Sequence, residues 1–161
     1  MRRPCDRGRQ DSSKAFARNS RKFLAPCEGR APMTPAARVA AAIDCLDRIA
    51  AGEAAEKVLT GWARANRFAG SRDRAAIRDH VFDALRQWRS AAWAGGGETG
   101  RARMLGLMRL QGVDPDTVFT GEGYAPRPLS DAERAAGARL EDAPEAVRLD
   151  WPDWLVEETR E

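Results

Sequence analysis

Seven arginines crowd the middle of this 161-residue chain, between positions 64 and 89, where only three aspartates accompany them. A guanidinium group can bind phosphate oxygens in a bidentate way, and a nearby helix start adds free backbone N–H donors. Such a cluster predicts sequence-tolerant, salt-dependent affinity for RNA. The candidate RNA-binding residues are Arg64, Arg67, Arg72, Arg74, Arg78, Arg86 and Arg89.

A structural interpretation competes with the functional one at each of these positions, because exposed arginines also solubilise an alanine-rich helical surface. Arg74 lies near an apolar stripe, so we expect it to pair with a carboxylate or with the C-terminus of a neighbouring helix. His80 lies beside the same stripe, which favours a packed role over a catalytic one.

The residues needed for metal or cofactor chemistry are missing from the pattern. The three cysteines form no CxxC pair and there is a single histidine, which excludes a zinc constellation. No strand leads into a Gly-rich loop with an acidic residue about 20 positions further on, as a nucleotide-type cofactor site requires. We therefore expect no catalytic residue, metal or cofactor in this chain. The cysteine usage also favours a reduced, cytoplasmic compartment.

Composition favours an all-α protein, a bundle of five to six helices. Alanine, arginine, leucine and glutamate are abundant, 32% of residues are charged, and β-branched residues are few. The length fits one domain with a tail. No run approaches the roughly 20 apolar residues of a membrane span, so we expect no membrane partner.

The stretch 70–93 is the predicted central helix. Ile77, Val81, Leu85 and Trp88 form one apolar stripe, Ser71 is placed as N-cap, and the glycines at 95–97 end the run. The segment 95–100 is interpreted as a flexible linker.

Other helices are expected on both sides of it. One covers 36–51, opened by Thr34 as N-cap and Pro35, and a second covers 53–66. A third, 100–111, is capped by Thr99 and is apolar around most of its circumference, so it should lie at the centre of the bundle. Ser130 and Glu133 form a capping box that should start a helix ending at residue 140.

Charge divides the chain unevenly. Residues 1–33 hold nine Lys and Arg against three acids and lack helical periodicity, so they read as a disordered basic tail. Three interpretations of this tail stay open: an RNA-binding arm, a transit-like peptide, or sequence upstream of a true start at Met33. From residue 121 to the end, five arginines face eleven acids, so only one face favours a polyanionic partner.

Three segments, in order, resemble NusB-like domains, including those at the N-terminus of RsmB/NOP-type ribosomal RNA 5-methylcytosine methyltransferases. Asp73-Arg74-Ala75 with Leu85-Arg86 and Trp88-Arg89 resembles one family helix, although Asp83-Ala84 stands where the family usually has glycine after the aromatic. The second is a segment that resembles the family's opening, R..A...L..I..G..A...L, through Arg38, Ala42, Leu46, Ile49, Gly52, Ala55 and Leu59. The third is Leu105-Gly106-Leu107-Met108. Pro152-x-Trp154-Leu155 resembles the segment that leads into the family's catalytic domain.

The resemblance implies a NusB-like RNA-binding domain over 34–120, a loop and polar-helix linker over 121–149, and a junction over 150–161. It implies that a catalytic domain absent from this chain would methylate carbon 5 of a cytosine through a cysteine thiolate, using S-adenosylmethionine. The expected partners are RNA, in particular ribosomal RNA, and that catalytic domain, with no DNA expected.

Two other functions stay open. One is a free-standing NusB-like factor that binds RNA and a protein without catalysis. The second is a protein-binding helical module whose Trp-bearing C-terminus docks on another subunit.

Overall fold

The computed structural model describes residues 32–159, so the tail predicted at 1–33 lies almost entirely outside the described residues. Within that range every regular element is a helix, which confirms the all-α class, and none of these helices is long and apolar enough to cross a membrane. The helices are α1 (Pro35–Ala50), α2 (Ala55–Ala65), α3 (Ser71–Arg86), α4 (Trp88–Gly95), α5 (Gly100–Leu110), η2 (Pro115–Thr117), α6 (Asp131–Ala135), η3 (Leu140–Asp142), α7 (Glu145–Arg148) and α8 (Asp153–Glu158). The five longest match the expected bundle, and the short ones follow it.

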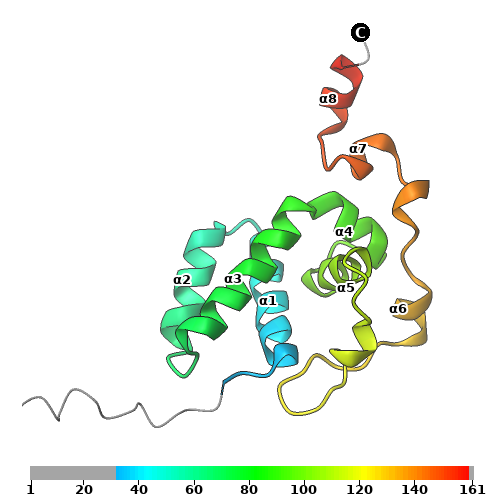
Figure 1. Ribbon diagram of the computed structural model, residues 1–161. Helices are drawn as coiled ribbons and strands as arrows, with labels where there is room; N and C mark the ends of the chain where they lie inside the picture. The colour runs from blue at the N-terminus through cyan, green and yellow to red at the C-terminus, as the bar shows by residue number, and fades with distance from the viewer. Residues whose placement is uncertain (1–31, 160–161) are drawn as a thin grey trace, which may run out of the picture. The chain divides into compact units, whose positions relative to one another are not determined.

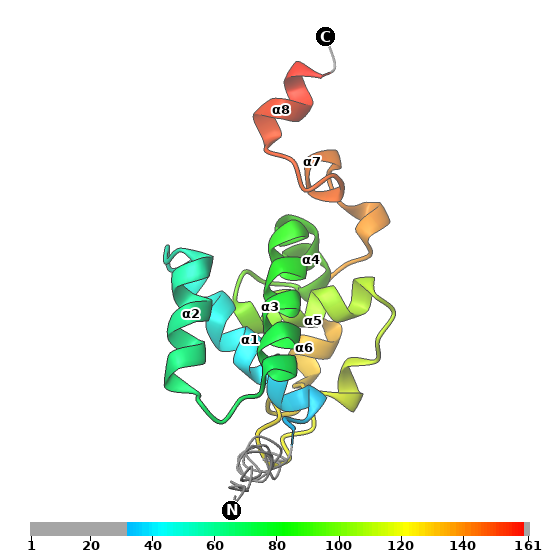
Figure 2. The same cartoon turned by 60° about the vertical axis from the view of Figure 1, so that its left-hand side comes forward.

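The core lies between α1, α3 and α5, with α2 on one side and α4 packed on α5 (Figures 1 and 2). Leu46 of α1, Ile77 of α3 and Leu105 of α5 are all buried in one cluster. The apolar stripes predicted for these helices thus face one another. As expected from its sequence, α5 is the most completely buried helix, because apolar residues surround most of its axis.

Local capping starts the helices where the sequence predicts. The Thr34 hydroxyl accepts from Ala37 N at 3.1 Å, and the Thr99 hydroxyl accepts from Ala102 N at 3.1 Å. The Ser130 capping box also forms, but α6 stops at Ala135 rather than reaching residue 140. It stops because Ala136 is extended and Gly137 follows with a φ of 89°.

The single helix predicted over 70–93 is wrong, because the chain breaks at Gln87, with φ −115° and ψ 41°. The break frees the N–H groups of a new helix start, and a distant carboxylate receives them. Asp150 Oδ1 accepts from Arg89 N at 2.8 Å and from Ser90 N at 2.9 Å. Upstream, Gly70 rather than Ser71 is the N-cap of α3.

The glycines around 95–106 form a close helix crossing, not the flexible linker expected at 95–100. Gly95 is buried, and a Cβ there would overlap the Ala102 carbonyl oxygen. A Cβ at Gly106 would overlap the Ala91 carbonyl oxygen and lie 2.6 Å from Gly95 N. Missing side chains on both helices therefore let the α4 and α5 backbones touch.

Candidate nucleic-acid interface

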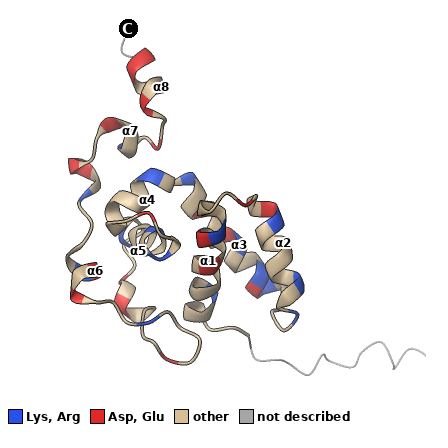
Figure 3. Ribbon diagram, turned by 180° about the vertical axis from the view of Figure 1, so that it is seen from behind, with Lys and Arg blue, Asp and Glu red and all other residues tan. Residues whose placement is uncertain are grey.

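Four of the seven predicted arginines gather where α2 ends and α3 begins. Arg64 lies in the last turn of α2, Arg67 in the connection, and Arg72 and Arg74 in the first turn of α3. All four are exposed, and within residues 32–159 no acceptor pairs with their guanidinium groups. We call these four residues the arginine turn. Figure 3 shows blue segments gathered at this junction.

The connection that displays the arginine turn is fixed at both ends. The backbone and side-chain amides of Asn66 both donate to Trp62 O at 2.9 Å, which closes α2. Ala69 is buried, and its N–H donates to Asn66 O at 3.0 Å. The four guanidinium groups therefore project from a defined backbone.

Asp73 is the acid nearest in sequence to these arginines, but its carboxylate pairs with a residue of another helix. It is 4% exposed and pairs with Arg38 of α1 at 2.9 Å. Burial raises the pKa of Asp73, but hydrogen bonds from the Met33 and Gly70 N–H groups and from Arg38 outweigh burial and hold it below its usual value. The carboxylate is thus ionised yet turned inward. In the part of the chain that the structure describes, no acid therefore pairs with the arginine turn.

The predicted pairing of Arg74 is wrong, since its guanidinium has no partner among the described residues. The arginine that pairs with the start of α3 is Arg38 of α1, through Asp73. The sequence placed Arg38 in the family-like pattern but gave no sign of this partner. Arg74 instead borders a groove of about 380 Å³ between α2 and α3, with Arg78 and Thr60.

The remaining three predicted residues do not join this surface in the same way. Arg78 pairs with Asp79 at 3.0 Å and Arg86 with Asp83 at 2.8 Å, both exposed pairs of small energetic value. Arg86 lies about 21 Å along the helix axis from Arg72, at 1.5 Å per residue.

Arg89 is a structural residue. Its guanidinium donates to Asp153 at 2.9 Å and to the Trp151 carbonyl. Arg89 therefore attaches the C-terminal segment, residues 121–159, to the start of α4. Arg89 is therefore not part of the candidate interface.

No family model, curated protein or solved structure matches this chain. The NusB-like resemblance consequently stays a prediction.

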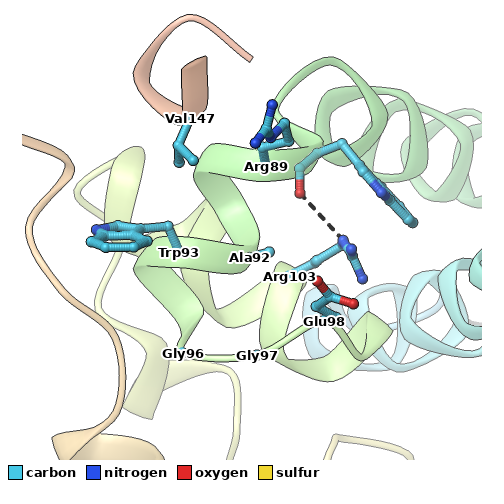
Figure 4. Close-up of a pocket in the computed structure, with 9 residues that line it drawn as sticks. Arg89, Ala92, Trp93, Gly96, Gly97, Glu98, Arg103 and Val147 are labelled. Atoms are coloured by element: carbon cyan, nitrogen blue, oxygen red, sulfur yellow. Dashed lines mark hydrogen bonds between the residues drawn. The ribbon is translucent and has the colours of Figure 1, made fainter. Parts of the chain in front are cut away.

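A second hollow, of about 500 Å³, lies beside α4 and contains an arginine that the sequence analysis missed (Figure 4). Arg103 is 5% exposed, its guanidinium lies 3.7 Å from the centre of the Trp88 ring, and its Nε donates to Trp88 O at 3.3 Å. Burial lowers the pKa of Arg103, while Glu98 and Asp47 act in the opposite sense. The sequence feature that could have predicted the burial of Arg103 is the apolar circumference of α5. A helix that is buried on all sides also buries the polar residues between its leucines.

Arg103 has an internal role in this hollow. It joins α5 to the start of α4, and the nearby Glu98 carboxylate makes the site unfavourable for an anion. Its Nη1 is buried and has no hydrogen-bond partner among the described residues.

The Cys45 thiol and the His80 imidazole are both packed in the fold rather than placed for catalysis. Burial raises the pKa of the Cys45 thiol to about 11, so it is not a nucleophile at neutral pH. His80 is half-buried, and burial lowers its pKa, which agrees with the packed role predicted for it. Residues 32–159 contain no group of three or more His, Cys, Asp or Glu that could hold a metal ion.

Proposed function

We propose that this chain binds RNA through the arginine turn and positions ribosomal RNA for a cytoplasmic S-adenosylmethionine-dependent cytosine-5 methyltransferase. The observation that supports RNA binding is the concentration, at one helix junction, of four exposed guanidinium groups that have no acidic partner among residues 32–159. Several arginines elsewhere in residues 32–159 bind carbonyls or carboxylates, for example Arg38, Arg101 and Arg109. Unpaired charge kept on a fixed turn suits a polyanionic backbone.

The methyltransferase part of the proposal rests on the resemblance of three segments to RsmB/NOP-type enzymes. In this proposal, S-adenosylmethionine and the catalytic thiolate belong to a domain outside residues 32–159. The described residues contribute only RNA binding.

RNA affinity across a salt series tests the first part. In filter binding of the full chain to a single-stranded RNA, the arginine turn should contribute about −3 to the slope of log K against log salt, since four phosphate contacts contribute about −0.7 each. Replacing Arg67, Arg72 and Arg74 together with glutamine should make the slope less steep by about 2. Absence of binding at about 50 mM salt would remove the RNA hypothesis.

A matched control separates the surface from net charge. The triple glutamine variant of Arg127, Arg139 and Arg148 removes the same three charges from exposed positions of the C-terminal segment. It should bind RNA almost as the unaltered chain does. An equal loss in both variants would mean that only the total charge matters.

The methylation part has its own test. Deleting the gene should abolish a 5-methylcytosine in ribosomal RNA, read by bisulfite sequencing. An unchanged methylation pattern would overturn this part while leaving RNA binding to be judged by the filter assay.

The protein-binding module is the second candidate, and one observation favours it. Leu149, Trp151 and Trp154 are 45%, 40% and 60% exposed on the C-terminal segment. Exposed tryptophans at a chain end are suited to docking on another protein. RNA binding that is absent at low salt, with capture of a defined subunit that Trp154→Ala abolishes, would favour this function.

A further inference from the structure

One large apolar side chain is exposed within the arginine turn. Phe68 follows Arg67 directly and is 49% exposed, although phenylalanine usually lies in a core. The other large apolar side chains exposed in the described range lie after α5, in loops or in the C-terminal segment. They are Val113, Tyr124, Leu149, Trp151 and Trp154.

The turn holds Phe68 between two fixed neighbours. On one side Asn66 closes α2 through its bonds to Trp62 O, and on the other Ala69 is buried with its N–H bonded to Asn66 O. Beyond Ala69, the Gly70 N–H donates to Asp73 at 3.2 Å. The backbone that presents the ring is thus ordered before any ligand arrives, which reduces the entropy lost on binding.

An exposed aromatic ring among unpaired guanidinium groups matches one ligand chemistry. Proteins that bind single strands combine cations for the phosphates with aromatic rings on which bases stack. A paired base keeps its faces inside the duplex, and an A-form helix offers a side chain mainly ribose and phosphate. A ring such as that of Phe68 is therefore useful only against an unpaired base.

We propose that Phe68 stacks on an unpaired base of the RNA while the arginine turn holds the adjacent phosphates, so that the chain selects single-stranded over double-stranded RNA. This inference rests on the proposed RNA binding and adds to it the kind of RNA and a residue that recognises it.

The test compares Phe68 variants on two RNAs of equal length, an unstructured strand and a perfect duplex. Phe68→Ala should raise the Kd for the single strand about tenfold, which is the usual effect of losing one stacked base, and the Kd for the duplex less than about twofold. Phe68→Trp keeps a stacking ring and should retain the affinity. Phe68→Leu keeps apolar volume without a π face and should behave as the alanine variant does.

Each outcome bears on one proposal. If the unaltered chain binds both RNAs and Phe68→Ala changes neither Kd, stacking is wrong and the proposed RNA binding survives. The same conclusion follows if Phe68→Leu keeps the full affinity for the single strand. If the unaltered chain binds neither RNA, the proposed function itself fails. Because Phe68 is half exposed, thermal melts of the variants should match that of the unaltered chain, which shows that a loss of affinity is not a loss of fold.

Discussion

Arginine has two roles in this chain, according to whether its guanidinium finds an acceptor. Arg109 donates to the carbonyls of Ala94, Ala136 and Glu133 at 2.6 to 2.8 Å, so it joins the end of α4 to α6. Arg101 pairs with Glu133 and lies 4.7 Å from the Phe119 ring centre. These arginines are structural, whereas the guanidinium groups of the arginine turn have no acceptor among residues 32–159.

The pair between Arg101 and Glu133 strongly lowers the pKa of the Glu133 carboxyl group. Hydrogen bonds from Arg101 and Ser130 lower the pKa of Glu133 to about 2 from its usual 4.5. A folded-state pKa below the unfolded one adds stability above about pH 4.5, and this stability is lost as the pH falls towards 2.

Glu133→Gln should therefore lower the free energy of unfolding by about 1 kcal/mol at neutral pH, an amount reduced by the solvent near this carboxylate. Urea unfolding between about pH 2 and 7 should show a smaller acid-induced decrease in the variant than in the unaltered chain. Glu141→Gln is the control, because its pair with Arg139 is 74 to 77% exposed. Equal pH profiles for Glu133→Gln and the unaltered chain would contradict the assigned role.

At the scale of the elements, the α4–α5 crossing depends on glycine. Gly106 of α5 lies against the Ala91 carbonyl of α4, and both backbones lack side chains at the contact. Gly61, in the middle of α2, is also a helical glycine, but nothing lies within 4 Å of a Cβ built there.

Gly106→Ala should lower the free energy of unfolding by about 2 to 3 kcal/mol, because a methyl group there forces the two helices apart. Gly61→Ala should leave stability unchanged or raise it by up to about 1 kcal/mol, since alanine is the better helix former. Thermal or urea unfolding of the two variants measures the contrast. A Gly106→Ala variant as stable as Gly61→Ala would mean that α4 and α5 do not approach closely.

For the molecule as a whole, the last part of the C-terminal segment is attached to the helical core through the start of α4. Asp150 adopts a φ of 53°, unusual outside glycine but tolerated by aspartate, and receives two backbone N–H groups and the Ser90 hydroxyl. Arg89 binds Asp153 and the Trp151 carbonyl beside it. Side chains from α4 and from the C-terminal segment thus both contribute to this contact.

Asp150→Ala should release this contact at a cost of about 1 to 2 kcal/mol, as for loss of a helix cap. Hydrogen exchange should quicken at the amides of Arg89 and Ser90, while amides of α1 keep their protection. Asp142→Ala removes an acid of the same segment that is exposed, and should change neither. Unaltered exchange at Arg89 and Ser90 would show that Asp150 is not their acceptor.

The sequence by itself determined the helical class, the longer helices and several of their starts, because these depend on residues a few positions apart. The stripe of Ile77 and Val81 and the caps Thr34, Thr99 and Ser130 are signals of this kind, and the structure confirms them. The arginine turn was predicted only as part of a larger set.

The tertiary structure decided which arginines are free, where the central helix breaks and how close α4 and α5 come. The acceptors of Arg38, Arg89, Arg101 and Arg109 lie between 15 and 64 residues away along the chain. The cap that Asp150 provides for α4 is equally remote. Contacts of this kind leave no local pattern, because folding brings the partners together only when the helices pack.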